Sequence, residues 1–289
     1  MNDMEIDWNN VWAGETELWN QSAGKPCQGF WADKKSAEIF AKKDIRQHKK
    51  RLEKTLSLLE PTPEMRVLDI GAGPGNLAIP MAQKTAWVTT VEPSCGMNAV
   101  LDDQIKENRI TNITTIRSTW EELDITRLAP PFDLVVASLS LGMSDLKGAI
   151  EKMNQVCTGR VALFWHAGIP QWEDMPRALW PDIFAKPYHG GPKSDIIFQL
   201  LYQMGIYPEV TVFPNDFCEI FESMDSAVSF YARRFQILSP EHRPIVEAYL
   251  KAHCKKDYRG LVHEFSHMIM KLSWRPGDFG CSGIQGEKG

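Results

Sequence analysis

Three glycines at alternate positions constrain this chain more than any other feature, because they directly follow a short apolar run. The run consists of Val67, Leu68 and Ile70, as expected of a buried parallel strand, and Gly71, Gly73 and Gly75 come next. Glycines in this place let the chain turn sharply and let a ligand contact bare backbone. Residues 77–84 then have a helical pattern, so the sequence predicts a strand, a ligand-binding turn and a helix.

The residues around the glycines narrow the kind of ligand. A dinucleotide fingerprint has its third glycine where this chain has Asn76, and no Gly-Lys-Ser or Gly-Lys-Thr of a P-loop follows Gly73. Asp69 would repel a pyrophosphate but attract the ammonium group of a nucleoside that carries an amino acid. A second strand, over residues 88–92, ends in Glu92, whose carboxylate suits a bidentate bond to two ribose hydroxyls.

With these residues the chain resembles the class I S-adenosylmethionine (SAM) dependent methyltransferases. Residues 67–75 match the first motif of that family, Glu92 matches its ribose-binding acid, and residues 132–137 match its fourth-strand motif. The resemblance covers residues 60–168 and implies an α/β, Rossmann-like seven-stranded sheet whose last strand is antiparallel. It also implies an N-terminal helical lid, C-terminal insertion helices, SAM as the cofactor and S-adenosylhomocysteine as the product.

The resemblance further implies where the parts of SAM would lie. The glycine turn would pass beneath the methionine portion, Asp69 would place the ammonium group, and Glu92 would hold the ribose. Thr119 stands where the family has an adenine-binding Asp, so a hydroxyl or backbone amide would take over that contact beside Trp120. The predicted cofactor-binding residues are Asp69, Gly71, Ala72, Gly73, Gly75, Asn76, Glu92, Pro93, Ser94, Met97, Thr119, Trp120, Glu121, Ser138 and Leu139.

We predict three parts in the chain. Residues 1–60 form an N-terminal helical cap, residues 61–168 the SAM-binding core, and residues 169–289 a substrate or lid insertion plus the strands that complete the sheet. Trp8 and Trp12 lie one helical turn apart, which indicates either a helix fixed to the core by aromatic rings or a lid over the ligand.

The outer parts have their own patterns. Residues 33–59 predict a long helix, whose basic run over 42–51 is interpreted as a solvated face. The proline-rich stretch 170–192 is predicted to be irregular. Beyond it we predict helices over 194–204, 223–235 and 240–253, strands over 209–213 and 217–221 that pair with each other, and an antiparallel strand over 268–274.

A rival motif lies near the C-terminus. His263, Glu264 and His267 fit H-E-x-x-H, which on a helix would place two imidazoles on one face for zinc. A third ligand should follow on another helix, and only Glu287 remains, in a glycine-rich tail. We therefore predict no metal site, interpret these histidines as rim residues of a late strand, and keep a zinc hydrolase as the remote alternative.

The methyl acceptor is less constrained by the sequence. His166 ends the fifth predicted strand and is either a polar cap or a general base that faces the acceptor. Ser138-Leu139-Ser140-Leu141 stands where methyltransferases of base or glutamine amino groups have Asn-Pro-Pro-Tyr or Asp-Pro-Pro-Tyr, which disfavours those acceptors. The further candidates for substrate contact are Trp31, Trp165, Tyr188 and His189.

The aromatic N-terminal segment and the extra segment 170–260 favour a small molecule as the acceptor, and composition agrees with this. The formal net charge of −5 argues against a nucleic-acid partner, and no apolar run approaches the ~18 residues that span a bilayer. The N-terminus does not resemble a signal peptide, and the six cysteines show no CxxC pair, so we expect reduced thiols in the cytoplasm. The sequence thus predicts methyl transfer to a small molecule, with an RNA or protein methyltransferase and a SAM-binding protein without turnover as alternatives.

Overall fold

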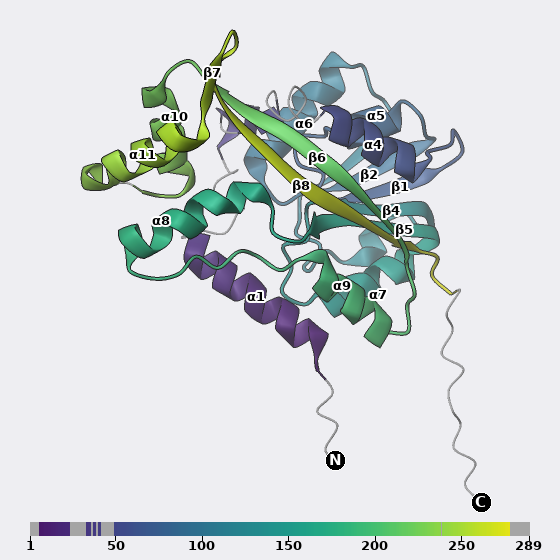
Figure 1. Ribbon diagram of the computed structural model, residues 1–289. Coiled ribbons are helices and arrows are strands. Elements are labelled where there is room, and N and C mark those ends of the chain that lie inside the picture. Colours follow the sequence, from purple (N-terminus) through teal and green to yellow (C-terminus); the bar gives the residue numbers. More distant parts are fainter. Residues whose placement is uncertain are drawn as a thin grey trace, which may run out of the picture.

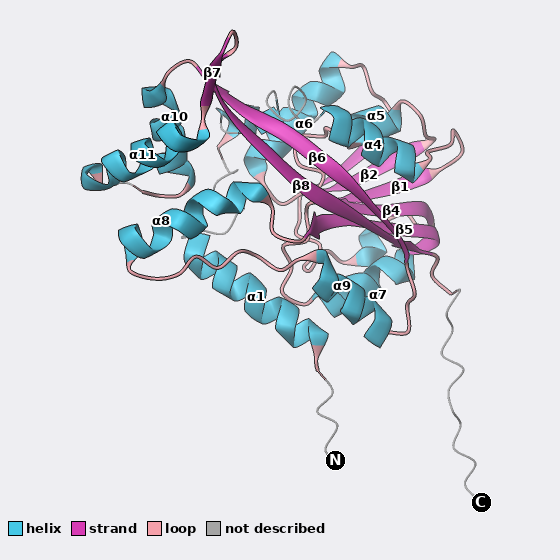
Figure 2. Cartoon of the chain, viewed as in Figure 1, coloured by secondary structure: helices cyan, strands magenta, loops and turns pink. Residues whose placement is uncertain are grey.

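A single twisted sheet with helices on both sides organises the chain (Figure 2). The computed structural model describes residues 6–23, 33–35, 37–38, 40–41, 49–237 and 239–277. The strand order is β3-β2-β1-β4-β5-β8-β6, and the short β7 pairs with β8. In Figure 1, α4, α5 and α6 lie on one side of this sheet, and α1, α7 and α9 lie on the other.

The first five strands form the parallel part of the sheet. They are β1 (Arg66–Ile70), β2 (Trp87–Val91), β3 (Ile113–Ile116), β4 (Phe132–Ser138) and β5 (Cys157–Ala167). Each neighbouring pair among them runs parallel. Apolar side chains of β1 and β4 are buried on both faces, which is why these strands appear as nearly continuous apolar runs in the sequence. The predicted strands of the core are confirmed.

The sheet closes with two long strands of opposite direction. The strand β8 (Gly260–Trp274) runs antiparallel to β5, and β6 (Glu209–Phe221) runs antiparallel to β8. The predicted seven-stranded sheet with an antiparallel last strand is therefore confirmed, and β7 (Lys255–Asp257) adds a short eighth strand.

The expected pairing between residues 209–213 and 217–221 is wrong. Both segments belong to one continuous strand, β6, which pairs with β8 along its whole length. Pro214 lies in the middle of β6 and looks like a break in the sequence. It is tolerated because β6 is the edge strand of the sheet, where a missing N–H costs no ladder hydrogen bond on the outer side.

The outer halves of β6 and β8 extend beyond the sheet as a two-stranded arm, formed by residues 215–221 and 261–267. β5 pairs with β8 only as far as Met268, whereas β6 accompanies β8 to Leu261. Figure 1 shows both strands running together from the sheet toward β7, beside α10 and α11. The arm places its own residues next to the carboxyl end of β5.

Three helices pack against the arm and give it a core of its own. They are α8 (Asp174–Phe184), α10 (Met224–Arg234) and α11 (Arg243–His253). Trp180, Tyr231 and Phe265 are buried together in this cluster. The predicted irregular stretch 170–192 is thus partly wrong, because it contains α8. The prolines obscured a helical repeat in which Met175, Leu179 and Ile183 are buried at four-residue spacing.

The remaining helices surround the main sheet. They are α1 (Trp8–Ala23), α4 (Lys49–Leu59), α5 (Ala78–Ala82), α6 (Cys95–Glu107), α7 (Leu146–Val156) and α9 (Ser194–Gln203), with the 3-10 turns η1 (Ile125–Arg127), η2 (Gln171–Glu173) and η3 (Pro240–His242). The helices predicted over 194–204, 223–235 and 240–253 correspond to α9, α10 and α11. Only the last part of the predicted helix over 33–59 is described as a continuous helix, α4, and residues 42–48 of its basic run lie outside the described residues.

Aromatic rings fix α1 to the core, as one of the two interpretations of Trp8 and Trp12 expected. Trp12 is fully buried, its Nε1 donates to the Met143 carbonyl over 2.8 Å, and its ring centroid lies 5.9 Å from that of Trp165. Asn9 bonds both Asp145 and the backbone of α7. In the part of the chain that the structure describes, no helix combines the length and apolar character needed to cross a membrane.

Candidate functional site: a nucleoside pocket at the sheet rim

The glycine turn after β1 is built by close approach and by left-handed backbone. Gly71, Gly73 and Gly75 have φ of +71°, +56° and +90°, where side chains are strained. A Cβ on Gly71 would collide with Ser140, and one on Gly75 would collide with Leu101. A Cβ on Gly73 would meet nothing within 4 Å. The first and third glycines therefore serve packing, and the second leaves bare backbone at the rim of the sheet.

This assignment predicts opposite effects for two glycine-to-alanine substitutions. Gly75→Ala should lower the free energy of unfolding by about 2 kcal/mol, since it combines backbone strain with overpacking against Leu101. Gly14→Ala, on the exposed side of α1 with nothing within 4 Å, should raise it by about 0.5–1 kcal/mol. Urea denaturation of both variants checks this, and equal effects of the same sign would contradict the role of Gly75.

Glu92 connects the end of β2 to the glycine turn. Its Oε2 accepts from Gly73 N over 2.9 Å, and its Oε1 accepts from Ser94 N over 2.8 Å. The side chain is buried, and burial raises its pKa while these two backbone bonds oppose that rise. Each carboxylate oxygen has a second lone pair, so Glu92 can still accept hydroxyl donors from a ligand.

Asp69 lies next to this clamp with no comparable support. It is 2% exposed, and its Oδ2 has no hydrogen-bond partner among the described residues. Burial, followed by the negative charge of Glu92, raises its pKa to about 7. A buried carboxyl without a partner is costly in the free protein, and a cationic ligand group would satisfy it.

The carboxyl end of β4 completes the rim. Ser140 Oγ donates to the Ile70 carbonyl over 2.6 Å, and Leu139, with φ of +56°, donates its N–H to the Phe164 carbonyl over 3.0 Å. These bonds connect β4 to β1 and β5 at the point where Ser138 ends its strand. Sequence reasoning missed the role of Ser140. Its position opposite the first glycine could be found only once β1 and β4 were known to be neighbours.

Residues 67–159 match a protein-family model described as a methyltransferase domain. The chain carries a class I SAM-dependent methyltransferase domain. The family predicted from the glycine turn, Glu92 and the fourth strand is thereby confirmed, and SAM is the cofactor of that family.

The matches to curated relatives cover only part of this chain and only part of each relative. An uncharacterised protein of Haemophilus influenzae is 31% identical over 140 residues, which are 48% of this chain and 50% of that protein. A probable ribosomal RNA small subunit methyltransferase A of Methanosphaera stadtmanae is 36% identical over 79 residues, which are 27% of this chain and 28% of that one. The chain thus spans about half, or less, of the curated relatives it matches.

Solved structures share the fold of the methyltransferase domain. The YcgJ protein of Bacillus subtilis has a TM-score of 0.53 at 17% identity, covering 78% of this chain and 98% of that one. A putative methyltransferase of Bacillus halodurans has the same TM-score and coverage at 13% identity. At such low identity these two likenesses show the fold alone.

The residues of the rim fit SAM. Asp69 offers its Oδ2, which has no partner among the described residues, to an ammonium group, Glu92 offers free lone pairs for hydroxyls, and Gly73 leaves room beside the backbone. The other predicted cofactor residues around β1 and β2 lie on the same turn or at the start of α6. There the Ser94 side chain caps the helix by accepting from Met97 N over 3.3 Å. The individual contacts with SAM stay predictions.

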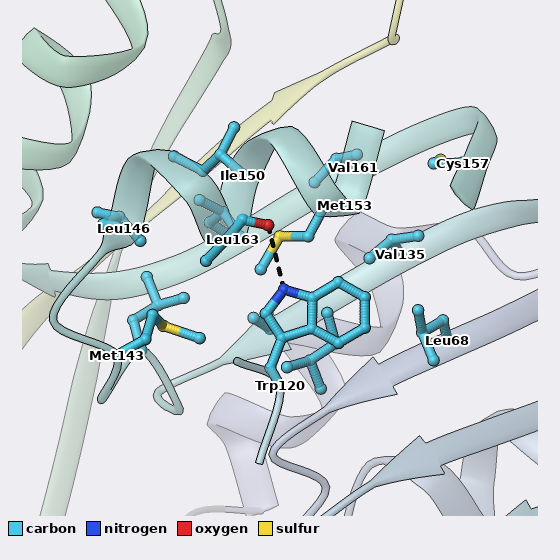
Figure 3. Close-up of a cluster of buried hydrophobic side chains, with 14 of the residues drawn as sticks. Leu68, Trp120, Val135, Met143, Leu146, Ile150, Met153, Cys157, Val161 and Leu163 are labelled. Atoms are coloured by element: carbon cyan, nitrogen blue, oxygen red, sulfur yellow. Dashed lines mark hydrogen bonds between the residues drawn. The ribbon is translucent and has the colours of Figure 1, made fainter. Parts of the chain in front are cut away.

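The predicted adenine side has a different character. Trp120 is 2% exposed, and its Nε1 donates to the Ala149 carbonyl over 3.1 Å. Figure 3 shows its indole among Leu68, Val135 and Met153. Trp120 is therefore part of the hydrophobic core, and little of its surface remains for a ligand.

The residues beside Trp120 are more accessible. Thr119 Oγ1 is bonded to the carboxylate of Glu122 over 3.1 Å, and Glu121 is exposed. The hydroxyl predicted to replace the family's Asp is thus already engaged within its own turn. Adenine recognition by Thr119, Trp120 and Glu121 stays a prediction.

His166 lies at the end of β5, where the sheet and the arm meet. Its ring centroid is 5.4 Å from that of Trp165, 6.2 Å from that of Trp172 and 5.2 Å from that of His267. His267 Nε2 lies 3.3 Å from Asn215 Nδ2 on β6. The structure therefore brings together residues from β5, η2, β8 and β6, of which sequence reasoning had selected only His166 and Trp165 for the acceptor.

The surroundings of His166 keep it neutral. Burial first, and then the charges of His267, Lys193 and Arg51, lower its pKa to about 3. At neutral pH only about one molecule in 10,000 would carry the proton on such a group. His166 therefore suits hydrogen bonding to an acceptor better than abstraction of a proton.

This neutrality predicts a small effect of substitution. His166→Asn should lower the rate of methyl transfer less than about tenfold and leave its pH profile unchanged between about pH 6 and about pH 9. Steady-state rates with an identified acceptor, measured across that range, check this. A wild-type rate that rises through a pKa near 6.5, and loses that rise in His166→Asn, would instead identify His166 as the general base.

The other predicted acceptor residues differ in burial. Trp165 is buried, and its Nε1 donates to the Pro192 carbonyl over 2.7 Å. Tyr188 is buried against Trp180, and burial raises its pKa. His189 is exposed and donates its backbone N–H to Ser22 of α1 over 3.1 Å. Trp31 lies outside the described residues.

The zinc alternative fails on secondary structure. His263 and His267 lie on the strand β8, not on a helix, so four residues of strand hold their backbones about 13 Å apart. His263 Nδ1 is within 2.8 Å of the Tyr231 hydroxyl. Among the described residues, no group of three or more His, Cys, Asp or Glu side chains could hold a metal ion. The motif lies on β8, as expected of late-strand residues, although both histidines are buried and not exposed at its rim.

Proposed function

We propose that this protein transfers the methyl group of SAM to a small-molecule acceptor bound beyond the carboxyl ends of β4 and β5. The observation that carries the proposal is the buried carboxylate of Asp69, whose Oδ2 has no hydrogen-bond partner among the described residues, beside the glycine turn that Glu92 clamps. SAM, when bound, supplies a methyl carbon made electrophilic by a positively charged sulfur. The residues of this chain would bind SAM and the acceptor, orient them toward each other and exclude water. An in-line displacement needs these three contributions from a protein.

Each side chain of the rim has a distinct part in the proposal. Asp69 would pair with the ammonium group, and Glu92 would accept from the ribose hydroxyls through its remaining lone pairs. Gly73 would let the ligand approach the backbone. His166, held neutral, would offer a hydrogen bond at the acceptor side, and no base is required for an acceptor that is already nucleophilic.

A small acceptor is supported by the structures around the arm. The helices α8, α10 and α11 belong to the predicted part 169–289, which we propose forms the acceptor side. The turn η2, which leads into α8, brings the ring of Trp172 to the end of β5, and Arg234 of α10 lies over that ring, as expected for a small-molecule site. The formal net charge of −5 disfavours a polyanionic acceptor.

RNA is the second candidate acceptor, because two curated relatives are named as ribosomal RNA methyltransferases. One is the Methanosphaera stadtmanae protein, and the other is a 23S rRNA (uracil(1939)-C(5))-methyltransferase of Pectobacterium carotovorum, 29% identical over 112 residues. These matches cover 27% and 37% of this chain. They therefore support a likeness in part of the chain and not over its whole length.

Incubation with methyl-labelled SAM separates the candidates. The protein should label one or a few compounds in a metabolite extract and leave total RNA and cell protein unlabelled. A matched sample of Asp69→Asn, expected to bind SAM poorly, controls for adventitious transfer. Label in RNA or protein would contradict the small-molecule proposal, and SAM binding without any labelled product would favour a binding protein without turnover.

A further inference from the structure

A buried carboxylate with two cations lies beside the proposed acceptor site. Glu173 of η2 is 1% exposed. Its Oε1 accepts from Lys193 Nζ over 2.7 Å, and its Oε2 accepts from Arg177 Nη2 over 2.9 Å. We call these three residues the Glu173 cluster. One negative and two positive side chains give the cluster a net charge of +1 inside an acidic protein.

The chain fixes the Glu173 cluster firmly in place. Gln171 Oε1 accepts from Ser266 N over 2.7 Å, which ties η2 to the arm. A Cβ on Gly190 would collide with the Glu173 carboxylate, and a Cβ on Gly191 would lie 2.9 Å from the ring of Trp19. The loop before α9 therefore passes so close to Glu173 and Trp19 that Gly190 and Gly191 leave little room for a Cβ.

The Glu173 cluster retains free donors. An ammonium group has three N–H donors, and Lys193 Nζ uses two of them, on Glu173 and on the Gly191 carbonyl 2.5 Å away. A guanidinium has five donors, and Arg177 contributes one of them to Glu173. The Lys193 and Arg177 side chains are 15% and 38% exposed, so a ligand can reach them.

The position of the cluster connects it with the acceptor side. Trp172, the residue before Glu173, has its ring 6.2 Å from that of His166. The charges of Lys193 and of Arg51, on α4, are both felt at His166. Arg234 lies over the ring of Trp172, with its Cζ 5.7 Å from the ring centroid.

Carboxylates also lie on the neighbouring elements, with Asp174 at the start of α8 and Asp195 in the first turn of α9. Glu219 of the arm is buried near Tyr231, where the charges of Glu219 and Arg234 both act on the hydroxyl. Within the Glu173 cluster itself, one carboxylate serves two cations. An anionic ligand would complete the charge balance there, and an ammonium-bearing ligand would add to the imbalance.

We propose that Lys193 and Arg177 bind an anionic group, a carboxylate or a phosphate, on the methyl acceptor. This inference rests on the proposed function, since it assigns a substrate class to the same site. Trp172 and His166 would lie between the bound anion and the carboxyl end of β4, next to the predicted cofactor residues Ser138 and Leu139. The acceptor is thus a small molecule with an anionic group at one end and the methyl-accepting atom at the other.

The test uses matched probes with the full protein saturated by S-adenosylhomocysteine. Sets of aromatic carboxylates, the corresponding phosphate monoesters and the corresponding neutral amides are compared by ligand-observed NMR and by quenching of tryptophan fluorescence. At least one of the anionic classes should bind at least tenfold more tightly than the amides, and which class does so distinguishes carboxylate from phosphate. Amides that bind as tightly as both anionic classes would overturn the inference.

Two substitutions separate anion binding from a structural role. Lys193→Met should weaken binding of the anionic probes at least tenfold, whereas Lys186→Met, on the exposed part of the same loop, should leave it unchanged. Glu173→Gln removes the competing carboxylate and should strengthen anion binding severalfold. If Glu173 served only to hold the loop, Glu173→Gln would weaken binding, and that result would overturn the inference.

Cofactor binding distinguishes this inference from the proposed function. Calorimetry should give the same SAM affinity for wild type, Lys193→Met and Glu173→Gln, because the Glu173 cluster belongs to the acceptor side. Wild-type protein that does not bind SAM would refute the proposed function. Wild-type protein that binds SAM but shows no preference for anionic probes would refute only the anionic acceptor.

Discussion

Asp69→Asn should make the protein more stable above about pH 7 and make it lose most of its affinity for SAM. The carboxylate is buried without a hydrogen-bond partner for Oδ2, and its pKa is raised from 3.8 to about 7. A raised carboxyl pKa means that the folded protein binds this proton more tightly than the unfolded chain does. Stability from this group is therefore present at low pH and is lost as pH rises from about 4 to about 7.

The size of the stability effect follows from the two pKa values. A difference of about 3 pKa units corresponds to about 4 kcal/mol between the protonated and ionised limits. Asparagine is neutral throughout, so the contribution of this position to the pH dependence should vanish. Urea denaturation of wild type and Asp69→Asn at about pH 5 and about pH 8 checks this. A difference between the two proteins that stays constant with pH would show that Asp69 titrates normally.

The same carboxyl should couple SAM binding to pH. Pairing with an ammonium group requires ionised Asp69, so SAM affinity should rise with pH up to about 7 and then level off. Asp69→Asn should bind SAM at least tenfold more weakly at about pH 8, with no such rise. Asp182→Asn, at an exposed position of α8, is the matched control and should behave as wild type.

Glu92→Ala should lower SAM affinity at least about 100-fold, the largest single effect that we expect on the cofactor. The substitution removes both the acceptor for ribose hydroxyls and the two bonds to Gly73 N and Ser94 N. Each charge-assisted hydrogen bond is worth about 1.5–3 kcal/mol, so the loss of one or two accounts for a change of that size. Titration calorimetry with SAM and with S-adenosylhomocysteine measures it.

Glu92→Gln separates the two roles of the carboxylate. Glutamine has one oxygen that can accept from a backbone N–H, so part of the clamp on the glycine turn should survive. Its affinity for SAM should lie between those of wild type and Glu92→Ala. Glu107→Ala, at the exposed end of α6, serves as the control. A Glu92→Ala protein with full SAM affinity would contradict the ribose assignment.

The cofactor-binding part of this fold could be predicted from local sequence patterns. The strand β1, the glycine turn and Glu92 lie within about 25 residues of sequence, and each is recognisable from composition and spacing alone. Their pairing follows from the rule that parallel strands place their carboxyl ends at one rim. The sheet order and the antiparallel last strand could be expected only from the family resemblance, which adds what periodicity leaves open.

The acceptor half could not be derived in this way because its contacts are distant in sequence. Glu173 and Lys193 are twenty residues apart, and nothing in either segment marks them as partners. Only the four-residue spacing of Glu173 and Arg177 was a visible signal, and it is typical of any exposed helical pair. For Trp120 the sequence signal was present but ambiguous. A tryptophan beside a binding turn suggests stacking on a ligand, although its ring can equally face the core.

Secondary structure at the arm was obscured by single residues. Pro214 suggested the end of a strand, although an edge strand tolerates it, and Pro176 and Pro181 concealed α8. The H-E-x-x-H match at His263 depends on a helix that the β alternation of the surrounding residues does not form. At Pro214 and at His263 the pairing of β6 with β8 decided the structure.

A crystal structure with S-adenosylhomocysteine tests the central claim most directly. We predict that its ammonium group lies within hydrogen-bond distance, about 3 Å, of Asp69, and that its ribose hydroxyls lie equally close to Glu92. Its backbone-facing side should rest against Gly73. A molecule bound at another place on the sheet, with Asp69 still buried and unpartnered, would contradict the account.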